Sequence, residues 1–200
     1  PMKQSTESSS VIVGIDEAGR GCLAGPVVAG CCAMTDALTS HPLIQDSKQL
    51  NAEQREEAFA WIQLHCSYGF GIGEADVIDE KGILEGTEQA MHEALRDVEK
   101  QILPTYVLVD GRDKFWFNYP HSSIIDGDEK EPCISAASIV AKVMRDHIMI
   151  KCAVKYPQYG FEQHKGYATK QHIEALRNYG PCELHRTTFL TNIIGDNADL

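Results

Sequence analysis

The stretch Val11-Ile-Val-Gly-Ile-Asp-Glu-Ala-Gly-Arg-Gly21 joins a β-branched apolar run to two acidic residues and a glycine-rich turn. The run from Val11 to Ile15 is long enough for a buried strand and too short for a helix. Asp16 and Glu17 therefore come at the carboxyl end of a predicted strand. In α/β sheets, that end of a strand is where binding and catalytic sites form.

A second apolar run, Tyr106-Val-Leu-Val109, is also followed directly by an acid, Asp110. If the two strands are parallel neighbours, they lie about 4.8 Å apart, and Asp16 and Asp110 share one small volume. Two carboxylates that close repel each other unless a cation compensates them, and Mg²⁺ prefers oxygen ligands. The pair therefore predicts a divalent-metal site, with turn or helix-cap acids as the alternative.

Asp146 is a third acid in an unusual position. It lies three residues after Val143 and four before Ile150, so it falls on the apolar stripe of a predicted helix. A buried carboxylate costs several kcal/mol unless it is paired or bound to a metal. Asp146 is therefore a candidate ligand; alternatively, Lys142 at i−4 pairs with it at the edge of the stripe.

Strand-like and helix-like segments alternate along the chain, which indicates an α/β domain. Because the first three strands follow one another closely, they are expected to form an antiparallel meander within a mixed sheet. Strands are predicted over 11–15, 26–33, 68–72, 106–109 and 122–125, and helices over 53–65, 82–101, 135–155 and 169–179. Residues 1–10 are predicted to be a disordered tail or a cloning remnant, and residues 11–200 to form one domain.

The composition is that of a globular protein, with 200 residues, 43% hydrophobic residues and a net charge of −11. Net acidity disfavours non-specific binding to phosphate backbones. The charge is uneven, however, because residues 142–186 carry 8 basic and 4 acidic residues. Non-specific nucleic-acid binding is therefore expected to be weak and to depend on a divalent metal and on this basic segment.

No apolar stretch approaches the roughly 18 residues of a membrane span, and no signal peptide is recognisable. The seven cysteines form no C-x-x-C pair, which favours reduced thiols in a cytoplasmic protein. Four aromatic residues lie in the segment 113–120; they are predicted to pack against the body, with a recognition surface as the alternative.

Several blocks together resemble type 2 ribonucleases H, the ribonuclease HII family, over about residues 11 to 190. The blocks are Gly14-Ile-Asp-Glu-Ala-Gly-Arg-Gly21, Ala24-Gly-Pro-Val27, Asp46-Ser-Lys48, Val109-Asp-Gly111, Ser135-Ala-Ala-Ser-Ile-Val-Ala-Lys-Val-Met-Arg-Asp146, His164-Lys-Gly-Tyr167 and Gly180-Pro-Cys-Glu-Leu-His-Arg186. The resemblance implies a ribonuclease H-like fold, a five-stranded mixed sheet flanked by helices with a C-terminal helical portion. It also implies an endonuclease that cuts the RNA strand of RNA–DNA hybrids and single ribonucleotides in duplex DNA, leaving 3′-hydroxyl and 5′-phosphate ends.

The resemblance assigns the catalytic and metal-binding roles to Asp16, Glu17, Asp110 and Asp146. Two Mg²⁺ or Mn²⁺ ions about 3.5–4 Å apart are expected during catalysis. The family's elements that sense the 2′-hydroxyl map onto Gly19, Arg20, Gly21 and Tyr167. Lys48, Lys165 and Arg186 are candidate phosphate contacts, whereas Lys142 and Arg145 are interpreted as balancing neighbouring acids.

Three other classes of protein stay open at this point. One is an acidic nucleic-acid mimic, which would have no convergent carboxylates. A metal-dependent DNA nuclease or resolvase with the same acids would cut all-DNA duplexes and would not need Tyr167. A nucleotide-binding module that uses the glycine run would need no metal. The expected partner is an RNA–DNA hybrid or a ribonucleotide-containing duplex, bound by a monomer with no membrane attachment.

Overall fold

A computed structural model describes residues 10–44 and 47–194. Within these residues the strands are β1 (Ile12–Ala18), β2 (Val27–Ala33), β3 (Tyr68–Gly73), β4 (Tyr106–Asp110) and β5 (His121–Ile124). The helices are α1 (Asp36–Ser40), α2 (Ala52–His65), α3 (Ala75–Lys81), α4 (Ile83–Glu99), α5 (Gly127–Lys130), α6 (Pro132–Lys155), α7 (Phe161–His164), α8 (Lys170–Tyr179) and α9 (Thr187–Ile194). The predicted tail falls almost wholly outside the described residues, as does Asp46.

The five strands form one mixed sheet in the order β3-β2-β1-β4-β5. β1 pairs antiparallel with β2, and β2 with β3, whereas β4 lies parallel to both β1 and β5. The predicted meander is confirmed, and β1 and β4 are the parallel neighbours that the Asp16–Asp110 argument assumed. The largest error among the strand boundaries is at β1, which runs on through Ala18 because β2 continues to pair with Asp16 and Glu17.

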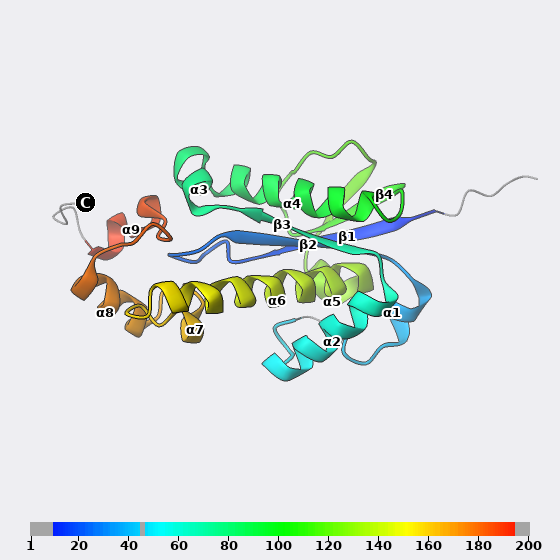
Figure 1. Cartoon of the computed structure of the whole chain (residues 1–200). Coiled ribbons are helices and arrows are strands. Elements are labelled where there is room, and N and C mark those ends of the chain that lie inside the picture. Colours follow the sequence, from blue (N-terminus) through cyan, green and yellow to red (C-terminus); the bar gives the residue numbers. More distant parts are fainter. Residues whose placement is uncertain (1–9, 45–46, 195–200) are drawn as a thin grey trace, which may run out of the picture.

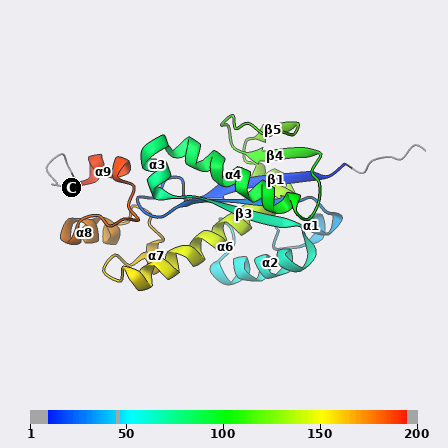
Figure 2. The same ribbon diagram turned by 45° about the horizontal axis from the view of Figure 1, so that its top comes forward.

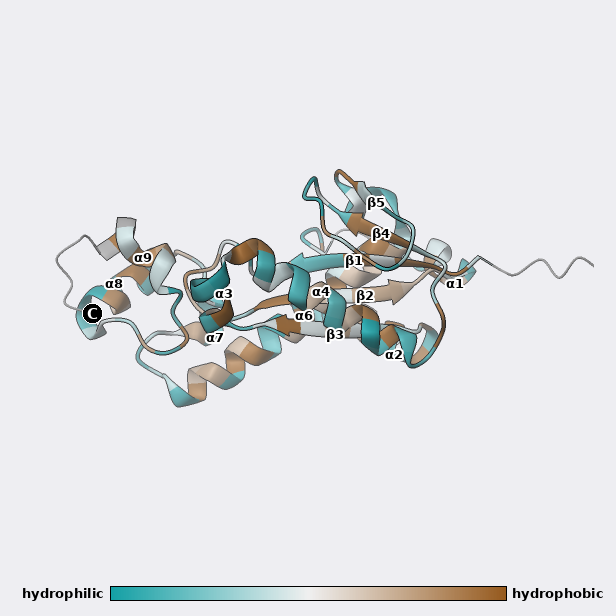
Figure 3. Cartoon of the chain, turned by 90° about the horizontal axis from the view of Figure 1, so that it is seen from above, coloured by the Kyte–Doolittle hydropathy of each residue, from teal (hydrophilic) through white to brown (hydrophobic). Residues whose placement is uncertain are grey.

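Helices cover both faces of this sheet, with α4 on one side and α6 and α2 on the other (Figure 1). Alternation along β1 and β4 sends Ile15 and Val109 into the core beneath α4. The second core cluster lies beneath α6 and includes Ile134 and Ile139. Figure 3 shows apolar residues along β2 and β4 and hydrophilic segments on α4, as expected for helices that bury one side.

Helix α6 lies close against the sheet because β2 carries a glycine at the crossing point. A Cβ atom on Gly30 would lie 2.2 Å from the Ala137 carbonyl oxygen and 2.9 Å from the Ala141 nitrogen. Both neighbours are backbone atoms of the helix, so they cannot turn aside as a side chain could. This close approach fixes the helix that carries Asp146 over β1 and β2.

Replacing Gly30 with alanine is therefore expected to lower the free energy of unfolding by about 3 kcal/mol, since α6 must move off the sheet. Urea denaturation measures this loss. Gly21→Ala is the matched control, because a Cβ there meets no atom within 4 Å. Equal stability of the two variants would contradict the account of this contact.

The helices α7, α8 and α9 gather at the end of the molecule opposite the N-terminal end of β1 (Figures 1 and 2). Two small clusters hold them there, one around Phe161 and Met149 and one around Leu176 and Leu190. The predicted C-terminal helical portion is confirmed. None of the helices in the described ranges is both long and apolar enough to cross a bilayer.

Candidate active site

The strand register brings Asp16 and Asp110 together. Parallel pairing of β1 with β4 ends at Ile15 opposite Val109, so the next residue on each strand is an aspartate. Because Ile15 and Val109 face α4, the following side chains face α6 on the other side of the sheet. Glu17 is one residue further and turns back towards the α4 side.

A cavity of about 260 Å³ opens where these two strands end. It is lined by Asp16, Glu17, Ala18, Gly19, Ser47, Lys48, Arg55, Asp110, Ser138, Lys142 and Tyr167. Six of the eleven predicted site residues are among them. The other five, Arg20, Gly21, Asp146, Lys165 and Arg186, lie outside the lining.

The acids of the cavity repel one another. Burial raises the pKa of Asp16 well above its usual value, and the negative charges of Glu17 and Asp110 raise it further. Burial also raises the pKa of Glu17, although the Arg20 guanidinium partly offsets this rise. The pKa of Asp110 is raised by burial and lowered in part by the hydrogen bond from the Gly127 N–H, 2.7 Å from Oδ1. Such a group of mutually destabilised carboxylates is what a divalent cation would neutralise.

The fourth predicted acid, Asp146, pairs with Lys142 across one helical turn, at 2.8 Å between Nζ and Oδ1. The pairing with Lys142 that was named as the alternative for Asp146 is therefore present, and Lys142 itself lines the cavity. Among the described residues, no group of three His, Cys, Asp or Glu side chains is arranged so that it could hold a metal ion. The oxygen donors fit Mg²⁺ or Mn²⁺ in kind, and Asp146 would reach such an ion only by leaving Lys142.

Sequence reasoning missed a further acid at this cavity, Asp128. It is 3% exposed, its Oδ2 lies 3.0 Å from Lys48 Nζ, and its charge raises the pKa of both Asp16 and Asp110. Lys48, in the loop before α2, therefore pairs with Asp128 of α5 beside the carboxylates. Asp128 comes four residues after β5 and inside α5, so it does not stand directly at a strand end, and only the spatial contact reveals it.

The turn from Gly19 to Gly21 is held from below by a buried arginine. Arg186 is fully buried, and its guanidinium donates to the carbonyls of Gly19 at 2.8 Å, Arg20 at 2.8 Å and Gly25 at 2.8 and 3.0 Å. The prediction that Arg186 touches substrate phosphate does not agree with this position, because the side chain has no exposed surface. Arg186 instead positions the turn.

Arg145 holds the same loop from α6. It too is fully buried, and it donates to the carbonyls of Pro26 at 2.9 Å, Ala24 at 3.1 Å and Lys165 at 2.8 Å. The interpretation that Arg145 balances a neighbouring acid was wrong, since its donors all meet backbone carbonyls. At Gly19, where φ is +91°, a Cβ would lie 1.9 Å from Arg145 Nε, so only glycine fits.

Tyr167 stands at the mouth of the cavity with 41% of its surface exposed. Lys142 and Arg145 lie over its ring, each 5.6 Å from the centroid. The Lys165 ammonium donates to two backbone carbonyls of α7, those of Glu162 and of Gln163, the latter at 3.5 Å. Arg20 bridges Glu17 at 3.1 Å and Asp113 at 2.7 Å.

A chain of buried histidines supports Tyr167 from behind. His185 Nδ1 accepts a hydrogen bond from the Cys182 N–H at 2.9 Å, so its Nε2 donates to His172 Nε2 at 3.0 Å. His172 Nδ1 then donates to the Tyr167 carbonyl at 2.9 Å. Burial lowers the pKa of both His172 and His185 to about 4.

Because these two pKa values lie below the usual 6.5, the unfolded chain binds more protons than the folded one between pH 6.5 and 4. Stability is therefore fully present above pH 6.5 and falls as the pH decreases; we expect a loss of about 2 kcal/mol for each of the two histidines from pH 7 to 5. Urea denaturation at both pH values measures it. His172→Gln should remove much of this dependence, whereas the exposed His65→Gln should keep it. An equal loss in wild type and His172→Gln would contradict the assignment.

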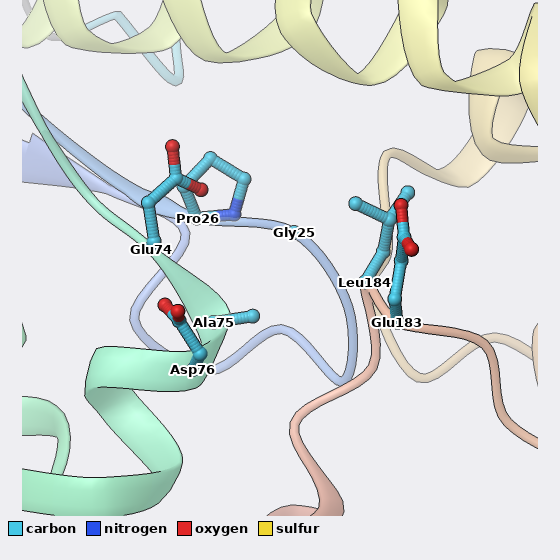
Figure 4. A pocket seen from close by; sticks show the side chains of 7 residues that line it. All are labelled: Gly25, Pro26, Glu74, Ala75, Asp76, Glu183 and Leu184. Atoms are coloured by element: carbon cyan, nitrogen blue, oxygen red, sulfur yellow. The ribbon is translucent and has the colours of Figure 1, made fainter.

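A second hollow, of about 350 Å³, lies apart from the carboxylate pair (Figure 4). Glu74 and Asp76 at the start of α3 face Glu183 and Leu184 across it, with Gly25 and Pro26 behind. Burial and the charge of Asp76 raise the pKa of Glu74. Its acidic lining contains no cationic side chain, and it does not include the predicted site residues.

Solved structures define the fold class. Ribonuclease HII of Archaeoglobus fulgidus, solved in complex with PCNA, superposes with a TM-score of 0.74 at 27% identity, covering 88% of this chain and 94% of that one. Ribonuclease H2 of Pyrococcus horikoshii superposes with a TM-score of 0.73 at 26% identity, covering 92% and 97%. The protein is thus an α/β protein of the ribonuclease H-like class.

The sequence comparisons narrow this class to one family. The family profile described as Ribonuclease HII matches residues 13–192. Ribonuclease HII of Syntrophus aciditrophicus is 44% identical over 180 residues, which cover 90% of this chain and 84% of that protein. The chain belongs to the ribonuclease HII family and is an endonuclease of the ribonuclease H type.

Proposed function

We propose that this enzyme cuts the RNA strand of RNA–DNA hybrids and the phosphodiester at a single ribonucleotide within duplex DNA. The observation that carries this proposal is that one cavity contains both the carboxylate pair and the elements suited to sense a 2′-hydroxyl. Asp16 and Asp110 lie at its floor, and Gly19 and Tyr167 lie at its wall. The products would carry 3′-hydroxyl and 5′-phosphate ends.

Recognition of the ribose would fall to the turn and the tyrosine. RNA differs from DNA in the 2′-hydroxyl, so a selective enzyme must contact that group. Arg186 occupies the carbonyls of Gly19 and Arg20, which leaves the N–H groups of the turn to donate to the 2′-oxygen. The half-exposed ring of Tyr167 would pack against the neighbouring deoxyribose.

The carboxylates would hold the divalent cations of the reaction. Asp16 and Asp110 would be the best-placed ligands, and Glu17 and Asp146 would complete the set. Mg²⁺ or Mn²⁺, two ions in all, would supply an activated water and stabilise the leaving 3′-oxygen. Lys142, once released, would face the incoming phosphate from the same wall.

The test uses two matched duplexes, one with a single ribonucleotide and one of DNA only, each with and without Mg²⁺. The proposal expects cleavage of the ribonucleotide duplex alone, and only with the metal. Cleavage of both duplexes at equal rates would favour the DNA nuclease or resolvase. Cleavage that persists in a chelator would exclude the metal-dependent mechanism.

The proposal extends to the setting of the enzyme. We expect it to act in the cytoplasm as a monomer on nucleic-acid duplexes. The contact surface would combine the cavity with the basic segment of residues 142–186, which has 8 basic and 4 acidic residues. Sedimentation of the free chain and of its complex with a duplex checks the stoichiometry.

A further inference from the structure

The segment from Arg112 to Asn118 alternates between exposed and inward-facing side chains. The exposed residues are Arg112, Lys114, Trp116 and Asn118, and those between them are Asp113, Phe115 and Phe117. Phe115 and Phe117 enter the core beneath α4. Trp116 is 64% exposed, so the prediction that the aromatic residues pack against the body fails for this one.

Contacts on the inward side hold the segment in place. Asp113 bonds Arg20 at 2.7 Å, and its carbonyl accepts a hydrogen bond from the Ser123 hydroxyl at 3.0 Å. The backbone N–H of Trp116 donates to the Glu88 carboxylate on α4 at 2.8 Å. The centroids of the Phe117 and His92 rings lie 5.1 Å apart. These contacts fix the backbone of the segment, and therefore the direction in which its exposed side chains point.

The segment starts at the active site. Arg112 is two residues after Asp110, and the Asp113–Arg20 ion pair continues to Glu17 at 3.1 Å. The six residues from Asp110 to Trp116 can span at most about 20 Å. Since a DNA strand rises about 3.4 Å per nucleotide, Trp116 lies within about six base pairs of the cut.

The exposed side has the chemistry of a nucleic-acid contact. It presents two cations, an indole and an amide, on a chain whose net charge is −11. The acids beside it are both engaged: the partly exposed Asp113 pairs with Arg20, and Glu88 accepts the Trp116 backbone N–H. Cations at this spacing fit successive phosphates, and an indole packs against sugars or bases.

We propose that Arg112, Lys114 and Trp116 form a second contact surface, which binds the phosphodiester backbone of the substrate duplex beyond the cavity. This inference rests on the proposed function, because it assumes that a duplex occupies the cavity. The surface would add affinity and align the duplex without touching the reacting phosphate. Its loss should therefore act on KM and leave kcat unchanged.

The experiment measures kcat and KM for the single-ribonucleotide duplex over a series of salt concentrations. Arg112→Gln combined with Lys114→Gln is expected to raise KM about tenfold and to lower the salt slope of log(kcat/KM) by about 1 to 2. Trp116→Ala is expected to raise KM about fivefold. kcat should stay within about twofold in each variant.

Lys100→Gln and Leu103→Ala are the matched controls, since both residues are exposed and precede β4, at the end of that strand opposite Asp110. They should leave KM and the salt slope unchanged.

An unchanged KM and salt slope in the variants would overturn the inference. So would a fall in kcat at constant KM, which would indicate a disturbed Asp113–Arg20 contact. Failure of the proposed function is distinct, because the wild type itself would then not distinguish the ribonucleotide duplex from the all-DNA duplex.

Discussion

Replacing Asp16 with asparagine is expected to lower kcat for the ribonucleotide duplex at least about 10³-fold, because the substitution removes a charged oxygen from the pair that would bind the metal. The fold should survive, since an asparagine oxygen can still accept the Glu17 N–H that lies 2.7 Å from Oδ1. Burial and the charges of Glu17 and Asp110 disfavour the ionised form of Asp16, which is why its pKa is raised. A neutral side chain should therefore leave the Tm unchanged or higher.

Single-turnover cleavage and thermal unfolding of the same preparation measure the two parts of this prediction. Asp97→Asn is the matched control, because Asp97 lies partly exposed on α4, away from the cavity, and its carboxylate bonds Lys100 at 2.7 Å. That variant should cut at the wild-type rate. Wild-type cleavage by Asp16→Asn would remove Asp16 from the mechanism, and a lowered Tm would contradict the electrostatic account.

Replacing Arg186 with methionine is expected to lower the free energy of unfolding by about 3 to 5 kcal/mol, because three buried carbonyls lose their donors. Those of Gly19, Arg20 and Gly25 all accept from this one guanidinium. Burial lowers the pKa of Arg186 to about 10, so the group is still charged at neutral pH. For a chain of this size the Tm should fall by roughly 6 to 20 °C.

Urea denaturation measures this effect, with the exposed Arg177→Met on α8 as the control. Arg186→Lys should be intermediate, since one ammonium cannot reach all three carbonyls. A Tm for Arg186→Met within about 2 °C of wild type would show that the carbonyls find other donors. Direct phosphate binding by Arg186 would instead raise KM without lowering stability.

The sheet could be predicted from sequence because its strands are short apolar runs bounded by acids, glycines and prolines. Asp16 and Asp110 were visible as acids that follow apolar runs, but the parallel pairing of β1 with β4, which brings them together, was only assumed from the sequence and is given by the structure. The end of β1 was placed three residues too early. The reason is that pairing with β2, and not hydrophobicity, extends the strand through Asp16 and Glu17.

The surroundings of the carboxylate pair could not be predicted in the same way. Arg145 and Arg186 bond only backbone carbonyls, so no acidic partner marks them in the sequence. Asp128 reaches the site through the turn that precedes α6, and the short helices α5 and α7 have no hydrophobic period of their own. These features depend on contacts between distant segments, and periodicity carries no information about them.

The central claim is that Asp16 and Asp110 share a divalent cation. Titration with Mn²⁺, followed by the electron paramagnetic resonance signal of the free ion, tests it most directly. The wild type should bind Mn²⁺ in competition with Mg²⁺, and the double variant Asp16→Asn/Asp110→Asn should bind it at least about tenfold more weakly. Equal Mn²⁺ affinity in the wild type and the double variant would contradict the claim.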